Sequence, residues 1–171
     1  MDYNKGMRRL IRSFIFVAIL LFVGYLFGVK ELKFYKIISS SMEPTLLVGD
    51  RVMAVKPDNL VRKNIVVIKD PENGKDILAK RIIGLPGEKV DIRGGYVYIN
   101  GKRIEEPYIK EKPFYTLSLK IPQNSYFLLG DNRNKSKDSS VWGPVKEELI
   151  VGKVICCYWP FKRFKIFITK K

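Results

Sequence analysis

The chain has 171 residues, of which 46% are hydrophobic and 12% aromatic, a composition that excludes a disordered chain and suffices for one domain core plus an appendage. It carries 32 Lys+Arg against 17 Asp+Glu, a net charge of +15, and it has no histidine, which excludes a Ser-His-Asp triad. The positive charge suits nucleic acid or an anionic membrane surface, and equally a solvated, lysine-rich surface.

An apolar segment near the N-terminus predicts a membrane anchor. Residues 13–29 contain no charged side chain, and roughly 20 mainly apolar residues suffice to span a bilayer. We therefore expect a single transmembrane anchor over residues 10–29, preceded by a short cytoplasmic tail over 1–9 and followed by an extracytoplasmic domain over 30–171. A cleaved signal peptide is the alternative, but no small-x-small cleavage pattern follows the segment.

Beyond the apolar segment, short apolar runs separated by Gly, Pro and Asn predict a mainly β domain. Gly94-Gly95 and Asn100-Gly101 lie between such runs, as tight hairpin turns require, because both central positions must tolerate positive φ. We expect one antiparallel domain, built as coiled sheets or a partly closed barrel. The expected strands are residues 51–56, 64–69, 77–84, 89–93, 96–99, 125–129, 151–158 and 163–169. Residues 131–140 form a long polar loop.

The two cysteines, Cys156 and Cys157, are neighbours within an expected strand. Consecutive residues are too close together for ordinary disulfide geometry, so we expect two small buried strand side chains. The sequence has no Cys-x-x-Cys motif, no histidine and no acidic cluster. It therefore predicts neither a metal site nor a cofactor.

Ser41 and Lys80 are the candidate nucleophile and general base. A serine hydroxyl needs a positioned base, and a lysine can serve only when it is neutral, a form that burial favours by lowering the lysine pKa. Strand alternation places Lys80 on the same face as Leu78 and Ile82, which are apolar. Arg81 falls on the opposite face, so the pattern leaves open which cation points inward. A snorkelling lysine and a serine-rich turn are the structural alternatives.

Three motifs in a fixed order carry a family resemblance. They are Ser39-Ser40-Ser41-Met42-Glu43-Pro44-Thr45-Leu46 with Gly49-Asp50, then Lys80-Arg81-Ile82-Ile83-Gly84-Leu85-Pro86-Gly87-Glu88, then Gly130-Asp131-Asn132-Arg133-Asn134-Lys135-Ser136-Lys137-Asp138-Ser139. With these motifs the chain resembles the bacterial type I signal peptidases over nearly its whole length. The resemblance implies a mainly β fold of antiparallel coiled sheets with one N-terminal transmembrane helix, and serine endopeptidase activity.

The resemblance also implies a Ser/Lys dyad mechanism. Ser41 is then the nucleophile and Lys80 its general base, while the Ser41 backbone N–H and the Ser39 hydroxyl form the oxyanion hole. The implied reaction removes signal peptides from secretory preproteins. The implied partners are those preproteins and membrane lipid, with no nucleic acid, and the oligomeric state stays open.

Three further residues match supporting positions of the family. Ser136 matches the serine that orients the lysine ammonium, Asp138 the aspartate that braces the polar loop, and Gly130 a glycine beside the lysine, where a side chain would crowd the site. The family often has an arginine two residues after this aspartate, where the chain has Ser140. A salt bridge from Asp138 must therefore find another cation or be missing.

By the same resemblance, Ile37, Met42 and Leu78 line the pockets for small side chains of an extended substrate. Leu78 stands where an aromatic residue is common. The implied location is the bacterial cell membrane, with a single pass, a cytoplasmic N-terminus and the catalytic domain outside. Two alternatives remain: a different Ser/Lys processing protease, and a membrane-anchored basic β domain that binds envelope partners without catalysis.

Overall fold

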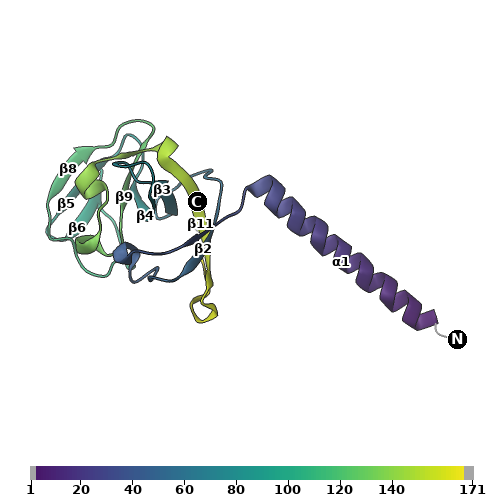
Figure 1. Cartoon of the computed structure of the whole chain (residues 1–171). Coiled ribbons are helices and arrows are strands. Elements are labelled where there is room, and N and C mark those ends of the chain that lie inside the picture. The colour runs from purple at the N-terminus through teal and green to yellow at the C-terminus, as the bar shows by residue number, and fades with distance from the viewer. Residues whose placement is uncertain (1–2, 168–171) are drawn as a thin grey trace. The chain divides into compact units, whose positions relative to one another are not determined.

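The structure is a computed structural model that describes residues 3–167, with the side chains of residues 3–5, 10 and 26–30 left aside (Figure 1). The chain divides into two compact units, residues 1–32 and residues 33–171. Part of the expected strand 163–169 lies outside the described residues.

The first unit is a single helix, α1 (Tyr3–Lys30). Its described large apolar side chains are exposed: Met7, Ile11, Phe14, Ile15, Phe16, Val17, Ile19, Leu20, Leu21, Phe22, Val23 and Tyr25. Over the residues that the structure describes, no helix combines the length and apolarity needed for it to be identified as a membrane span.

The second unit is mainly β and contains two antiparallel sheets, as the sequence predicted. The larger sheet has the strand order β1-β2-β11-β3-β4-β9-β10, with β12 also paired to β11. Its strands are β1 (Lys33–Lys36), β2 (Arg51–Val55), β3 (Ile65–Lys69), β4 (Ile77–Gly84), β9 (Ser125–Leu129), β10 (Val145–Lys146), β11 (Ile150–Trp159) and β12 (Lys165–Ile166). In the part of the chain that is described, β1 and β10 end the sheet without pairing to each other. The sheet is therefore open and does not form a closed barrel.

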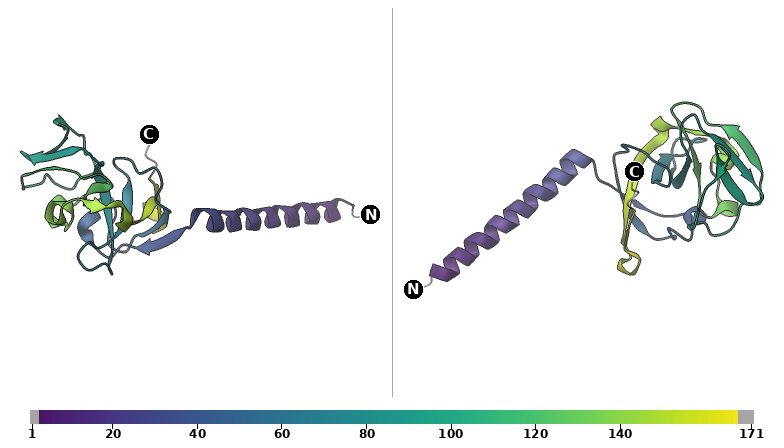
Figure 2. Two further views of the ribbon diagram at one scale, coloured as in Figure 1. Left: turned by 90° about the horizontal axis from the view of Figure 1, so that it is seen from above. Right: turned by 180° about the vertical axis from the view of Figure 1, so that it is seen from behind.

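The smaller sheet has the order β7-β6-β5-β8. Its strands are β5 (Lys89–Arg93), β6 (Tyr96–Ile99), β7 (Lys102–Arg103) and β8 (Leu117–Lys120). The predicted hairpin turns are confirmed, because Gly94 and Gly95 between β5 and β6 have φ of 57° and 79°, and Asn100 and Gly101 between β6 and β7 have φ of 49° and 80°. Figures 1 and 2 show β5, β6 and β8 together on one side of this unit, away from β11.

Short helices interrupt the sheets. They are the 3₁₀ helices η1 (Ser40–Met42), η2 (Arg133–Lys135), η3 (Glu147–Leu149) and η4 (Phe161–Arg163), and the one-turn helix α2 (Ser139–Trp142). The predicted strand over 163–169 was partly wrong, since η4 occupies its start and β12 covers only Lys165–Ile166. The cysteines lie in β11 and are free, with Cys157 buried and Cys156 half-buried.

Three apolar clusters form the core of the second unit, and strand β4 contributes to more than one of them. Ile82 belongs to a cluster with residues of β3, β9 and β11, whereas Ile83 belongs to the cluster between β4, β9 and the smaller sheet. Strand β4 pairs with β3 along one edge and with β9 along the other, and these two clusters cover its two faces. Both of its central cations are therefore buried: Lys80 is 2% exposed and Arg81 is 6% exposed.

Candidate active site

Ser41 lies in the one-turn 3₁₀ helix η1, between β1 and β2. Ser39, in extended conformation, caps this turn by accepting a hydrogen bond from the Ser41 N–H at 3.2 Å. The turn buries Ser41 and Met42. The Ser39 hydroxyl and the Ser41 amide, the two groups expected to hold an oxyanion, thus lie side by side and are hydrogen-bonded to each other.

Lys80 reaches Ser41 from strand β4. Its Nζ donates a hydrogen bond to Ser41 Oγ at 2.8 Å. Burial lowers the pKa of Lys80 from 10.5 to about 8, against the opposing effect of the nearby carboxylates of Asp138, Asp70 and Asp131. A serine hydroxyl and a desolvated lysine amine in direct contact are the groups that a Ser/Lys dyad requires.

The polar loop of residues 131–140 packs against the turn formed by Ser39 and η1. We call this segment the nucleophile turn, because it carries the candidate nucleophile Ser41. The Asn132 backbone N–H donates to the Ser41 carbonyl at 3.0 Å, and its side-chain Nδ2 donates to the Ser40 carbonyl at 3.2 Å. Asn132 is 1% exposed. Two consecutive carbonyls of the nucleophile turn are thus held by one residue, which sequence reasoning did not single out.

Gly130 and Ser136 pack closely beside the nucleophile turn. A Cβ atom added to Gly130 would overlap Ser136 Oγ and the Ser41 carbonyl oxygen. Ser136 Oγ is buried and has no hydrogen-bond partner among the described residues. The hydrogen bond to the Lys80 ammonium that the resemblance implies is therefore not formed in this structure.

Asp138 forms hydrogen bonds within the polar loop and makes no salt bridge to the residues that the structure describes. Its carboxylate is fully buried and accepts from the Gly130 N–H at 2.9 Å and from the Ser140 N–H and hydroxyl at 3.0 and 2.8 Å. Asp138 thereby caps α2. Ser140 stands where signal peptidases often have an arginine. Its hydroxyl donates a hydrogen bond to the Asp138 carboxylate, with which such an arginine would form a salt bridge.

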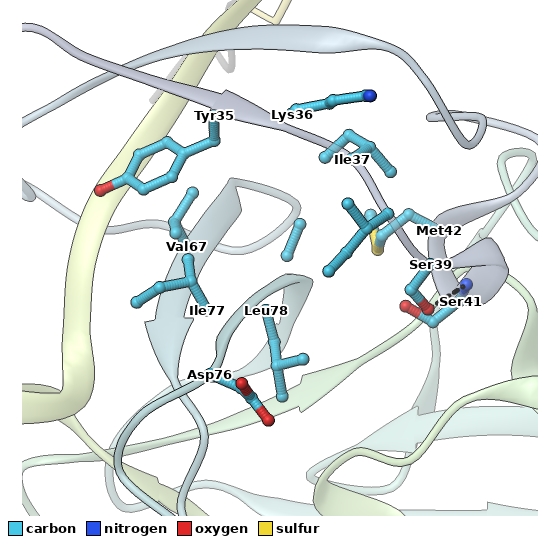
Figure 3. Close-up of a pocket in the computed structure, with 12 residues that line it drawn as sticks. Tyr35, Lys36, Ile37, Ser39, Ser41, Met42, Val67, Asp76, Ile77 and Leu78 are labelled. Atoms are coloured by element: carbon cyan, nitrogen blue, oxygen red, sulfur yellow. Dashed lines mark hydrogen bonds between the residues drawn. The ribbon is translucent and has the colours of Figure 1, made fainter.

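A pocket of about 390 Å³ opens beside the dyad (Figure 3). The three residues expected to bind substrate, Ile37, Met42 and Leu78, all line it, together with Ser39 and Ser41. Its wall is otherwise mostly apolar and includes Tyr35, Lys36, Ile38, Val67, Asp76, Ile77 and Ala79. In Figure 3 the two serines lie at one end of the pocket. The pocket therefore places a mostly apolar wall next to Ser41.

Comparison with known proteins identifies the family. The model of the family described as signal peptidase, peptidase S26, matches residues 7–159. The chain belongs to this signal peptidase family. It is therefore a serine endopeptidase of the signal peptidase type. The alternative of a basic β domain without catalytic activity does not agree with this family.

Individual signal peptidases support the same assignment. Signal peptidase IB of Staphylococcus aureus is 34% identical, over 92% of this chain and 94% of its own length. A probable signal peptidase I-2 of Synechocystis sp. is 40% identical, over 85% of this chain and 71% of its own length. The crystal structure of a signal peptidase I from Enterococcus faecalis, 34% identical, superposes with a TM-score of 0.52 over 56% of this chain and 97% of that one.

The structure also contains site features that the sequence pattern did not reveal for this signal peptidase. The pocket wall uses Tyr35 and Lys36 from β1, a strand too short to predict from alternation. Asn132 holds the Ser40 carbonyl, next to Ser41, and the buried ion pair between Arg81 and Asp131 joins β4, which carries Lys80, to the polar loop. Among the described residues, no group of His, Cys, Asp or Glu side chains could hold a metal ion.

Proposed function

We propose that this chain is a membrane-anchored type I signal peptidase that cleaves signal peptides from secretory preproteins with a Ser41/Lys80 dyad. One observation carries the proposal: Lys80 Nζ lies 2.8 Å from Ser41 Oγ, and Ser41 lines one end of a mostly apolar pocket. Lys80 itself is only 2% exposed. The alternative of a different Ser/Lys processing protease is less well supported, because the family match extends over residues 7–159.

Lys80 acts as general base in its neutral form. With a pKa of about 8, about a tenth of the side chain is neutral at pH 7, compared with a few in ten thousand for an ordinary lysine. The neutral amine accepts the proton of Ser41 Oγ as that oxygen attacks the scissile carbonyl carbon. The resulting ammonium gives the proton to the leaving amine when the C–N bond breaks. Lys80 then activates the water that hydrolyses the acyl-enzyme.

The tetrahedral intermediate is stabilised by the Ser41 N–H and the Ser39 hydroxyl. In the structure the amide donates to Ser39 Oγ. When substrate binds, the amide turns to the oxyanion and the Ser39 hydroxyl donates its own proton there. The same short segment therefore supplies the nucleophile and both donors. Ser136 accepts from the Lys80 ammonium after a rotation of its hydroxyl, which satisfies its buried oxygen.

The substrate binds as an extended segment along the pocket. Strand β1 ends its sheet and leads directly into the nucleophile turn, so a peptide can add beside it as a strand. The walls around Ile37, Met42 and Leu78 then accept the small neutral side chains that precede the cleavage site. A mostly apolar wall favours such residues over charged ones.

The N-terminal helix anchors the enzyme in the bacterial membrane. Residues 13–29 carry no charge, and the described apolar side chains of α1 are exposed in this chain alone, as a lipid-facing surface would be. Four basic residues precede the segment and three follow it closely, which favours a cytoplasmic N-terminus and an extracytoplasmic catalytic unit. Tethering concentrates the site at the surface where signal peptides emerge.

A cleavage assay tests the dyad. Full-length enzyme in detergent is incubated with a preprotein, and the wild type is compared with Ser41→Ala, Lys80→Ala and the control variants Ser118→Ala and Lys69→Ala, which change the same residue types outside the dyad. Ser41→Ala should abolish cleavage, and Lys80→Ala should lower kcat by about 10²–10⁴-fold. Cleavage at a rate near that of the wild type in either dyad variant would contradict the mechanism.

A topology assay tests the anchor separately. A tag at the C-terminus should be degraded when protease is added to intact spheroplasts, and the protein should remain in the membrane fraction after a carbonate wash. A tag that stays protected until the membrane is broken contradicts the proposed orientation. Release by carbonate contradicts the anchor itself and leaves the dyad untouched.

A further inference from the structure

The outer face of the smaller sheet gathers positive charge away from the active site. Strands β5 and β6 turn Val90, Ile92, Val97 and Ile99 into the core. By strand alternation the opposite face carries the remaining side chains, and the register places Arg93 beside Tyr96 and Arg103 beside Tyr98. None of the described residues that line the substrate pocket belongs to this sheet. The proposed peptidase mechanism therefore leaves this face unexplained.

Two tyrosine rings hold the cations of this face in place. Arg93 stacks over Tyr98 at 4.6 Å and Arg103 over Tyr96 at 3.7 Å, measured from guanidinium carbon to ring centroid. Lys112 lies 4.4 Å from the Tyr96 ring centroid and its Nζ donates to the Tyr96 hydroxyl at 2.7 Å. Stacking restricts long, flexible side chains before any ligand arrives, so less entropy is lost when they bind.

A second group of cations lies at the other end of the same face. Lys89 on β5 and Lys120 on β8 are directly opposite each other in the register and both are exposed. Like charges in this arrangement repel each other. Asp91 on the same face is already engaged, by the Ser118 hydroxyl at 2.6 Å and by Lys89 at 3.2 Å. Glu105 also lies close enough to Tyr96 to act on its pKa. The five cations still outnumber these two carboxylates, so the face keeps a net positive charge.

We propose that the outer face of the smaller sheet, formed by Lys89, Arg93, Arg103, Lys112 and Lys120 around Tyr96 and Tyr98, binds a linear polyanion whose charges are phosphate groups. Guanidinium forks suit phosphate oxygens, and the paired lysines supply point charges at a second position. Lys89 and Arg93 are four residues apart on β5, which separates the two groups by about 13 Å. A single phosphate reaches one group only, whereas a polymer engages both.

The side chains of this face favour a soluble polymer over a lipid surface. A protein face that enters a bilayer usually presents aliphatic side chains or phenylalanine beside its cations. On β5 and β6 the described aliphatic residues point into the core. The outer positions of β6 hold tyrosines whose hydroxyl or ring is used by a cation, and those of β5 hold charged residues. Attraction here rests on charge, and it should weaken steeply as salt is added.

Binding of inorganic polyphosphate to the full-length protein in detergent tests the proposal, with fluorescence anisotropy as the readout. Arg93→Ser combined with Arg103→Ser should weaken binding by about tenfold at low salt and make the dependence on salt shallower. Peptidase activity on a preprotein should stay unchanged, which shows that the variant is folded. Tyr96→Leu, which keeps every charge, should also weaken binding because it removes the ring beneath Arg103 and Lys112.

A charge-matched control decides whether the face or the net charge is responsible. Lys75→Ser combined with Lys146→Ser removes the same charge from other parts of the second unit. If this control weakens binding as much as the arginine variant does, the proposal is overturned, as it is if Tyr96→Leu binds like the wild type. Polyglutamate that binds as tightly as polyphosphate would overturn the preference for phosphate. Equal binding to vesicles of anionic phospholipid, lost in the same variants, would assign the face to a lipid surface instead.

Discussion

Arg81 donates two parallel hydrogen bonds to Asp131, from Nε to Oδ1 at 2.8 Å and from Nη2 to Oδ2 at 2.6 Å. Asp131 is fully buried, and the Arg81 guanidinium also donates to the Lys63 carbonyl at 2.9 Å and stacks on Tyr108 at 4.0 Å. Arg81 follows Lys80 in β4, and Asp131 begins the polar loop. The pair thus fixes the strand that carries the base against the loop that packs on the nucleophile turn.

Arg81→Met should destabilise the second unit strongly. The substitution keeps much of the side-chain volume but leaves the Asp131 carboxylate buried without its partner. Breaking a buried pair in this way costs about 3–5 kcal/mol in free energy of unfolding. Urea denaturation of the detergent-solubilised protein, followed by tryptophan fluorescence, measures the loss. Adding Asp131→Asn should recover a part of it, and a double variant that is less stable than Arg81→Met alone would contradict this account.

The sequence predicted the strands that are long or bounded by strong turns, and it predicted the dyad through its motifs. Strands β5 and β6 lie as expected because Gly94-Gly95 fixes their hairpin. Strands β1, β7, β8 and β10 were missed, since each has four residues or fewer and is defined by the neighbour it pairs with. Short segments carry too little alternation to be recognised alone.

Other parts of the site depend on contacts between residues far apart in the chain. The pattern could not decide between Lys80 and Arg81 because apolar clusters from other strands cover both faces of β4, so both side chains are buried. The contact from Asn132 to Ser40 joins residues 92 positions apart. An asparagine in a polar loop looks the same in sequence whether it faces solvent or holds a nucleophile turn.

Cleavage should accelerate with pH as Lys80 loses its proton. Because burial lowers the Lys80 pKa to about 8, kcat/KM should rise about tenfold per pH unit below that value and level off above it. Asp70→Asn removes a carboxylate that raises the Lys80 pKa, so its profile should shift to lower pH and its activity near pH 7 should increase. A profile that is flat between pH 6 and pH 9, or a shift to higher pH in Asp70→Asn, would contradict Lys80 as the base.

The lowered pKa of Lys80 should also make the free energy of unfolding depend on pH. Between pH 8 and 10.5 the unfolded chain binds a proton at Lys80 that the folded chain releases, so this residue should make stability increase with pH across that window. Lys80→Met removes the titrating group. The free energy of unfolding of the wild type should therefore rise relative to Lys80→Met between these two pH values, and a constant or falling difference would rule out the lowered pKa.

Gly130→Ala should lower kcat without unfolding the protein. The added methyl group overlaps Ser136 Oγ and the Ser41 carbonyl, so the nucleophile turn must move away. A displacement of about 1 Å at a catalytic group can cost about 10²-fold in rate. Gly24→Ala is the control, because its added Cβ meets no described atom within 4 Å beyond its chain neighbours and its own helix backbone. Wild-type kinetics in Gly130→Ala would show that the contact between the two loops does not position Ser41.

Ser136→Ala separates a role in catalysis from a role in packing. Since Ser136 Oγ makes no hydrogen bond to the described residues, its loss should change the free energy of unfolding by less than about 0.5 kcal/mol. If the hydroxyl accepts from the Lys80 ammonium during the reaction, its removal should lower kcat by roughly 10- to 100-fold, the effect of one hydrogen bond to a charged group.

The apparent pKa of the rate profile of Ser136→Ala should also fall, because the lost hydrogen bond favours the charged form of Lys80. Ser118→Ala, in the smaller sheet, should leave kcat and the profile unchanged. An unaltered kcat and pH profile in Ser136→Ala would show that Ser136 does not orient Lys80. The contact with Ser41 and the burial of Lys80 would then be sufficient to orient it.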